Sequence, residues 1–265
     1  MFQSPVCKVG LVVGCPRQAA VSSGQASNEM TSKRVVLLLC ACVAIQASKL
    51  HRAAIKGLAD EVAALLDSGL GINDIEDMVP SALGSTPLHL AVKEKHVNVV
   101  KLLIARGADL DATSDEGFTA LEVALFSGAF DIAKLLWKGG ADPNLVPDKR
   151  PVTMLQSAAS HAHARNVVIA RWLLSHGALV DKQGHNGCTA LHLAAWSGSV
   201  QMVKILLANG ASKALATCRG NLDALSVIRA LPATDDAKEM ARRRDIGVAL
   251  GAKPAPLSSE HLDEL

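Results

Sequence analysis

The chain has 265 residues, of which 49% are hydrophobic and 20% are charged, so it can bury a core and is not disordered as a whole. The 27 Lys and Arg residues against 25 Asp and Glu residues give a formal net charge of +2, which provides no general attraction to phosphate or to anionic membranes. Aromatic residues make up only 3% and Tyr is absent, which argues against an aromatic platform for single-stranded nucleic acid. We therefore expect no nucleic-acid partner and no membrane insertion.

The N-terminal region contains a pattern typical of a secretory signal. Lys33 and Arg34 precede an apolar run, Val35 to Ala47, that is shorter than the roughly 20 residues a transmembrane helix needs. We interpret residues 30–47 as a signal peptide that starts at Met30, and residues 1–29 as a disordered extension or a mis-assigned start. The alternative is an apolar helix that covers the open end of the fold. The first interpretation predicts the secretory pathway, and the second leaves a cytoplasmic protein possible.

The C-terminal residues 255–265 are interpreted as a flexible acidic tail. The last four, Leu262 to Leu265, resemble the tetrapeptides that retain proteins in the endoplasmic reticulum, but Leu262 stands where Lys or His is expected. Retention and a simple solvated tail both remain open.

An internal repeat dominates the rest of the chain. Leucines at positions 50, 88, 121, 155, 191 and 225 open similar segments and are 38, 33, 34, 36 and 34 residues apart. Each of the first five segments ends with paired leucines followed by a glycine, as in Leu102-Leu103 before Gly107. A fixed period of this length is the signature of a repeat architecture.

The segment Thr86-Pro87-Leu88-His89-Leu90-Ala91 has the T-P-L-H-x-A pattern of the ankyrin-repeat family, which the chain resembles over about residues 49 to 253. The resemblance implies an all-α repeat solenoid of helix-turn-helix units joined by β-hairpin loops, with about five repeats and a degenerate C-terminal cap. We place this domain at residues 48–254. No unit can bury its apolar face alone, so stacking supplies the stability.

Several residue types have local structural reasons. Thr86, Thr119, Thr153 and Thr189 can cap the first helix of a unit, and Pro87 suits the first helical position. Gly57, Gly128 and Gly198 fall seven residues after the opening leucine, where the helix must end in a left-handed conformation. Lys95 and Ala162 occupy that position in the second and fourth units, so we expect those two turns to differ.

The ends and the irregular parts of the repeat can also be predicted. Residues from Thr234 to about Gly251 look like a C-terminal capping helix with a favourable Glu239–Arg243 pair. Acidic neighbours offset the basic triplet at 242–244, so we interpret it as a solvated face. Extra residues at 74–85 and near 161–165 predict lengthened connections.

The histidines favour a structural role over metal binding. The resemblance implies that His51, His89 and His192 hydrogen-bond backbone groups and tie one repeat to the next, whereas Glu122 and Gln156 at the same position put those two ties in doubt. His161 and His163 are two residues apart and would point away from each other on a helix, which is poor for a shared metal ion. We predict no metal and no cofactor.

Catalytic signatures such as G-x-S-x-G, the phosphate-binding G-x-x-x-x-G-K and H-E-x-x-H are absent from the sequence, so no catalytic residue is assigned. Of six cysteines, only Cys188 and Cys218 lie within the repeats. In an oxidising compartment they could form a disulfide, and the alternative is two free thiols.

The resemblance also implies a concave groove formed by hairpin tips and first helices. The candidate partner-binding residues are Ile55, Lys93, Glu94, Asp115, Glu116, Phe126, Ser127, Lys149, His161, Trp196 and Ser197. Phe126 and Trp196 are the expected aromatic anchors, although either ring could fold back onto its own repeat. Trp137 and Trp172 lie beside leucine pairs and are interpreted as packing residues.

We therefore predict a non-enzymatic adaptor or regulator, monomeric, that binds one partner protein of unknown identity. Two alternatives remain, namely a secreted or lumenal binding protein and a regulatory fragment of a larger enzyme.

Overall fold

The computed structural model describes residues 49–75, 84–184, 187–215, 222–232, 234 and 236–252. All the described residues belong to one unit of the chain, Ile45–Leu265. The signal-like segment, residues 1–29 and the tail at 255–265 lie outside the described residues, so the predictions about them stay predictions. Among the helices that are described, none is both long and apolar enough to span a membrane.

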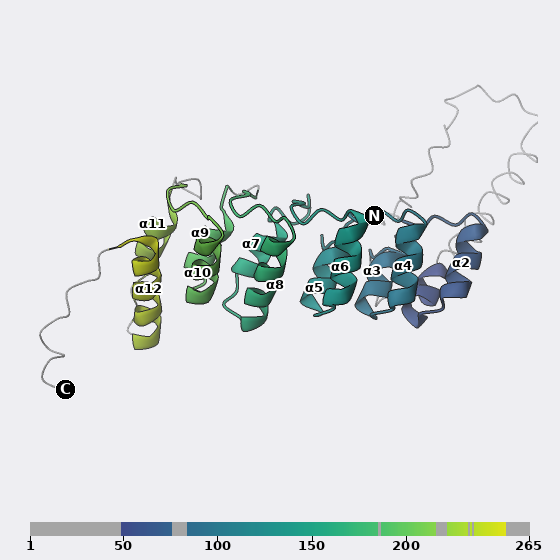
Figure 1. Cartoon of the computed structure of the whole chain (residues 1–265), viewed down its shortest axis with the longest axis horizontal. Helices are drawn as coiled ribbons and strands as arrows, with labels where there is room; N and C mark the ends of the chain where they lie inside the picture. The colour runs from purple at the N-terminus through teal and green to yellow at the C-terminus, as the bar shows by residue number, and fades with distance from the viewer. Residues whose placement is uncertain are drawn as a thin grey trace, which may run out of the picture. The chain divides into compact units, whose positions relative to one another are not determined.

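The described part of the chain forms a series of helical hairpins (Figure 1). The first helices of the six units are residues 49–56, α3 (Pro87–Lys93), α5 (Ala120–Phe126), α7 (Met154–Ala159), α9 (Ala190–Trp196) and α11 (Ala224–Arg229). The second helices are α2 (Ala59–Asp67), α4 (Val97–Ala105), α6 (Phe130–Gly139), α8 (Ala164–Ser175), α10 (Val200–Ala208) and α12 (Ala237–Leu250). This order confirms five helix-turn-helix units followed by a sixth, degenerate one.

The hairpins stack into two layers. In the first-helix layer α3 packs against α5, α7 against α9 and α9 against α11. In the second-helix layer α2 packs against α4 and α4 against α6, while α8, α10 and α12 follow one another in the same way. Each unit thus covers the apolar side of the next, and the all-α repeat solenoid expected from the sequence is confirmed.

Repeated leucines and alanines form the core between the layers. The opening leucines Leu88, Leu121, Leu155 and Leu191 are buried, and so are the alanines three residues later, Ala91, Ala124, Ala158 and Ala194. From the second helices, Leu103, Leu136, Leu173 and Leu206 enter the same cluster. Because alanine is small, the two layers can approach closely at each unit, as the sequence pattern indicates.

The turn inside each hairpin uses a left-handed residue. Gly57, Gly128 and Gly198 have φ angles of 74°, 75° and 71°, as predicted. Lys95 takes the same conformation, with φ 62°, so the expectation of a different turn in the second unit is wrong. The reason is that the turn hydrogen bonds, including His96 N to Ala91 O at 2.8 Å, require this geometry whatever the residue. At Ala162 the turn does differ, since the left-handed residue is missing there.

The N-terminal caps follow the sequence only in part. Thr119 and Thr153 form capping boxes with Glu122 and Gln156 respectively. Thr86 does not cap a backbone group, because its hydroxyl bonds His89 Nδ1 at 2.8 Å instead. At the fifth unit the Thr189 amide donates to His192 Nδ1.

The loops between units contain little regular strand. Within the described residues, Thr113 and Thr119 form an isolated antiparallel β-bridge. A ladder of side chains joins the loops instead, and each rung is an Asn or Asp that accepts a backbone N–H from the next unit. The rungs are Asn73 to Asp109, Asp111 to Asp142, Asn144 to Leu179 and Asp181 to Ser212, at 2.7–3.2 Å.

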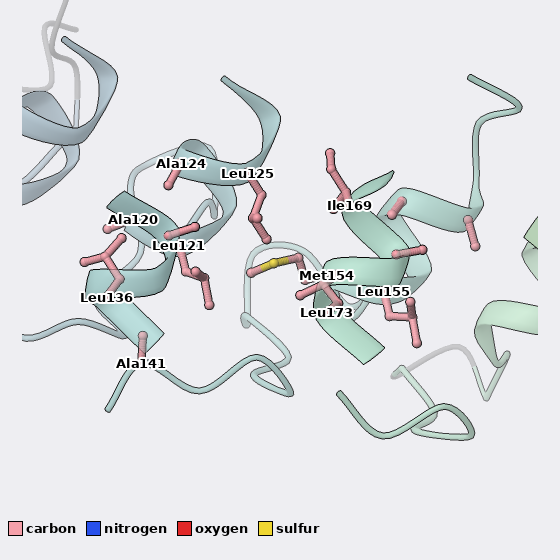
Figure 2. Packing of buried hydrophobic residues seen from close by; sticks show 14 of the residues in the cluster. Ala120, Leu121, Ala124, Leu125, Leu136, Ala141, Met154, Leu155, Ile169 and Leu173 are labelled. Atoms are coloured by element: carbon pink, nitrogen blue, oxygen red, sulfur yellow. The ribbon is translucent and has the colours of Figure 1, made fainter. Parts of the chain in front are cut away.

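At the junction between the third and fourth units, α5 and α7, and likewise α6 and α8, pack less closely than the neighbouring helices of each layer from α2 to α6 and from α7 to α12. Met154 occupies the position that holds Pro87, Ala120 and Ala190 in other units, and its long side chain is buried. Figure 2 shows Met154 reaching toward Leu125 across this junction.

The C-terminal helix α12 has the predicted form. Asp236 caps its N-terminus by accepting from Lys238 N, and Gly251 ends it in a left-handed conformation with φ 103°. The Glu239–Arg243 pair is present at 2.9 Å. Because α12 packs on both α10 and α11, it covers the last unit.

Candidate protein-binding surface

Side-chain ties hold neighbouring units together beneath the candidate surface. Nε2 of His51, His89 and His192 lies 2.9, 2.9 and 3.0 Å from the carbonyl oxygens of Asp74, Phe118 and Leu222. In His192, Nδ1 accepts from the Thr189 amide, so Nε2 carries the proton and donates to Leu222. The tying role implied by the family resemblance is confirmed for these three histidines.

The two units without this histidine are also tied, so the doubt about them does not hold. The Gln156 side-chain amide donates to the carbonyl oxygens of Lys182 and Cys188, which does the work of the histidine. Glu122 has no proton to donate when ionised, and Arg150 from the next loop donates to it at 3.1 Å. Glu122 thus also connects its unit to the next loop, but here the side chain at this position accepts the hydrogen bond and the loop residue donates it.

Arg150 is the centre of this last contact. Its guanidinium lies 4.0 Å from the centroid of the Phe118 ring and donates to Ser157 Oγ at 2.8 Å. Phe118 also meets Phe126 edge-on, with 6.5 Å between the ring centroids. The arginine therefore fixes two aromatic side chains of the third unit against the start of the fourth.

Burial shifts the pKa of groups in these ties. Burial raises the pKa of the Glu122 carboxyl above its ordinary value, although Arg150 and the Thr119 amide oppose this change. Burial lowers the pKa of His89, against the opposing effect of its bond to Phe118. In the loop ladder, burial raises the pKa of Asp111, and the negative charges of Asp142 and Asp109 add to it.

A pocket of about 370 Å³ lies where α3 and α5 meet the loop between their units. It is lined by Ser85, His89, Leu90, Lys93, Ser114, Glu116, Phe118, Val123 and Phe126. Three of the sequence-predicted residues, Lys93, Glu116 and Phe126, therefore share one hollow. Apolar side chains line it together with a lysine and a glutamate, which suits an apolar side chain with polar neighbours.

The remaining predicted residues lie along the same layer but serve different contacts. Glu94 and Ser127 are the C-terminal caps of α3 and α5. Lys149 pairs with Asp115 at 2.8 Å on the surface. The Ile55 carbonyl accepts from His96, and a Cβ on nearby Gly57 would lie 2.5 Å from that ring.

Trp196 at the end of α9 is the most exposed large apolar side chain among the described residues, at 67%. Phe126, the equivalent last residue of α5, is half-buried and packs against the core. Ser197 Oγ donates to Ala159 O of the preceding unit at 3.0 Å, so its hydroxyl already serves a contact between units.

The histidine pair of the fourth unit is not on a helix. His163 is the N-cap residue of α8 and His161 precedes it in a bend, so the assumption that they point apart is wrong. Their rings stack with centroids 6.4 Å apart, and His161 Nδ1 lies 2.8 Å from Ser160 Oγ. Among the residues whose placement is described, no group of three or more His, Cys, Asp or Glu could hold a metal ion.

Trp137, Trp172 and His176 form an aromatic cluster that sequence reasoning did not assemble. The His176 ring stacks on Trp172 with 3.9 Å between centroids and meets the Trp137 edge at 4.8 Å. Trp172 packs against the core as expected, but Trp137 is 36% exposed. Both indoles lie next to a leucine pair of the second helices, but Trp137 follows its pair and Trp172 precedes its pair, so the sequence gives no common spacing that would bring them together.

Cys188 is buried and disulfide-bonded. The alternative of a free thiol at this position is therefore wrong. Cys218 lies outside the described residues, so its role as the bonded partner stays a prediction.

Stacked hairpins tied through loops and first helices define a repeat protein whose exposed first-helix and loop residues can vary without disturbing the core. The chain belongs to the ankyrin-repeat family, whose model for three copies of the ankyrin repeat matches residues 50–147 and 139–217. Ankyrin repeats generally mediate protein–protein interaction, and this is the general role that the family gives the chain.

Known proteins show the same relationship. The chain is 31% identical over 220 residues to the B-cell lymphoma 3 protein homolog of Mus musculus. The aligned region covers 80% of this chain and 45% of that protein. It is 33% identical over 151 residues to the potassium channel AKT2/3 of Arabidopsis thaliana, covering 56% of this chain and 18% of the channel. It is 35% identical over 132 residues to the tyrosine-protein kinase HTK16 of Hydra vulgaris, covering 48% and 17%. The chain thus spans less than half the length of each of these relatives.

Proposed function

We propose that the chain is a non-enzymatic adaptor or regulator that captures one partner protein on its first-helix layer and the adjoining loops. The observation that carries this proposal is the hollow between α3 and α5, where Lys93, Glu116 and Phe126 converge. An apolar anchor of the partner would enter this hollow beside Phe118 and Phe126, and the charged rim would select its neighbours.

Trp196 provides a second anchor two units further along the same layer. Because two-thirds of its surface is exposed, its indole is available to a partner and contributes little to the core. The charged loop residues Asp115, Glu116 and Lys149 lie between unit two and unit four and would form the polar rim. Together these groups support a groove along the layer as the binding surface.

The experiment is partner capture with single substitutions. Trp196→Ala should weaken capture by about tenfold or more, since a truncated aromatic anchor can cost about 2 kcal/mol, and should leave the thermal midpoint nearly unchanged. Phe126→Ala should also weaken capture, with a moderate loss of stability because its ring is half-buried.

The matched control is Leu191→Ala on the same helix as Trp196. Leu191 is fully buried, so this change should cost about 2–5 kcal/mol of folding stability through a cavity. A large fall in melting temperature for Trp196→Ala, or unchanged capture by it, would reject the proposed anchor.

We also propose that the chain enters an oxidising compartment, which the disulfide at buried Cys188 supports. The signal-like pattern at 30–47 agrees with this compartment. N-terminal sequencing of the mature protein tests it: a start near Ser48 supports entry into the secretory pathway, and an intact N-terminus contradicts it.

A further inference from the structure

We infer that the second-helix layer carries a separate docking surface for an acidic polypeptide segment. Four basic side chains occupy the same position in four successive units, two residues before the buried leucine of each second helix. They are Lys101 on α4, Lys134 on α6, Arg171 on α8 and Lys204 on α10, and we call them the basic row.

The basic row is exposed to solvent. All four side chains are solvent-exposed, and none of them takes part in an ion pair among the described residues. Helices α4, α6, α8 and α10 together carry one acid, Asp131, whereas Lys138 and Arg165 add to the positive charge. These four helices therefore carry a net positive charge that is larger than the formal net charge of +2 of the whole chain.

Between α8 and α10 the row borders a shallow hollow of about 460 Å³. Arg171 and Lys204 lie on its sides, Ser175, Gln201 and Asn209 contribute hydroxyl and amide groups, and Ile205 and Ala208 contribute apolar surface. Among the described residues that line it, the hollow contains cationic and amide donors and no carboxylate, so it suits a carboxylate of a partner.

Exposed apolar side chains accompany the row where α6 and α8 follow one another. Trp137 lies one helical turn from Lys134 on α6, and its ring meets that of His176, the C-cap residue of α8. Val168, on the same face as Arg171, is 50% exposed. The surface therefore combines the basic row with two exposed apolar side chains, Trp137 on α6 and Val168 on α8.

The spacing fits an extended peptide. Packed helices lie about 8–10 Å apart, so each basic pair spans about that distance. In the polyproline II conformation, which repeats every three residues with a rise of about 3.1 Å per residue, carboxylates three residues apart share one face and are about 9 Å apart. The partner we infer is an acidic segment with glutamates or aspartates three residues apart at each end and apolar side chains at its centre.

This surface lies on the layer opposite to the proposed groove, so the two can be tested independently. The probe is a fluorescent peptide, Glu-Gly-Ser-Glu-Leu-Gly-Leu-Glu-Gly-Ser-Glu, titrated with the full chain at low ionic strength and read by anisotropy. We expect saturable binding that weakens as salt is added, and the Trp196→Ala protein should bind the peptide as the unchanged protein does.

The informative variant is R171E/K204E, which turns two attractions into repulsions and should weaken peptide binding about tenfold or more. The control K56E/K182E changes the net charge equally at exposed positions outside the second helices and should bind like the unchanged protein. R171Q/K204Q, which removes charge without reversal, should give an intermediate loss, and circular dichroism verifies that each variant is folded.

Three results would overturn the inference. The first is failure of the unchanged protein to bind the peptide at low salt, and the second is an equal loss in the control K56E/K182E. The third is tighter binding of a labelled oligothymidylate than of the peptide, because this would identify the row as a nucleic-acid surface. A peptide of the same composition with its glutamates clustered at one end should bind more weakly, and equal binding would overturn the match in spacing.

Discussion

Lys95 adopts a backbone conformation that residues other than glycine ordinarily avoid. Its φ of 62° lies in the left-handed region, where the turns of other units place Gly57, Gly128 and Gly198. The Cβ of an L-residue there costs about 1–2 kcal/mol. The bonds that close the turn, and the His96 side chain that reaches back to Ile55, maintain this strained conformation.

Lys95→Gly should therefore stabilise the protein. Glycine also raises the conformational entropy of the unfolded chain, which lowers stability by about 0.4–1 kcal/mol. Because relief of the strain is larger, we expect the free energy of unfolding to rise by about 0.5–1 kcal/mol. Equilibrium unfolding in urea measures it. The control is Lys101→Gly inside α4, which should lose about 1 kcal/mol. A loss of stability in Lys95→Gly would show that the lysine side chain outweighs the strain.

At the level of secondary structure, the ties between units could be predicted only where one residue carries the whole contact. His51, His89 and His192 each supply the donor to a backbone carbonyl, so their position in the repeat sufficed. Glu122 needs a donor from Arg150, 28 residues later, and repeat phase alone gives no indication of that partner. The hollow beside Phe126 was likewise invisible, since it depends on how the Phe118 loop folds over α5.

The Glu122 tie predicts a dependence of stability on pH. Its pKa is raised in the folded protein, chiefly by burial, so the folded state holds the proton more tightly than the unfolded chain. This contribution to stability is fully present below the ordinary value of 4.5 and is lost as the pH rises through the raised pKa.

Glu122→Gln replaces the titrating carboxyl by an amide that does not titrate. The capping box of Gln156 shows that a glutamine side chain at this position can cap the helix. The free energy of unfolding of the natural protein minus that of Glu122→Gln should fall as the pH rises above the ordinary pKa of 4.5, and urea titrations at three pH values from 4.5 upward measure it. His89 titrates in both proteins, so its effect cancels. A difference that grows with pH would mean that the Arg150 ion pair outweighs burial.

The loop ladder is the other contact between units that the sequence contained without revealing. Asn73, Asp111, Asn144 and Asp181 recur near the repeat period, yet they lie in segments that read only as polar turns. Their meaning appears once the next unit places a backbone N–H beside each one. The helices themselves follow from apolar spacing and glycine positions, which is why the fold was predictable and these rungs were not.

For the whole molecule, the disulfide at Cys188 leads to a prediction about covalent structure. Cys218 is the other cysteine within the repeats, and it belongs to the loop of the next unit, whereas the remaining four precede residue 45. We predict that Cys188 pairs with Cys218, which would close a loop of about 30 residues and contribute about 3–4 kcal/mol.

Digestion of protein purified without reductant, followed by mass spectrometry, tests the pairing. A peptide containing Cys188 linked to one containing Cys218 is the expected product, and Cys188→Ser should lower the thermal midpoint. A Cys188 peptide that is alkylated before reduction, or linked to Cys7, Cys15, Cys40 or Cys42, would contradict it.

The wide junction between α5 and α7 concerns the whole stack as well. Long side chains bridge it: Met154 through the core, Arg150 to Glu122, and Arg165 to Phe126 O at 3.1 Å. From α2 to α6 and from α7 to α12, the backbones of neighbouring helices in each layer approach more closely. In a linear array, each unit is supported only by its neighbours, so cooperativity is limited by the weakest coupling between them. Mechanical force on the two ends, or gentle warming, should therefore first disrupt the packing between the third and fourth units. The two halves of the stack should each stay folded for a time.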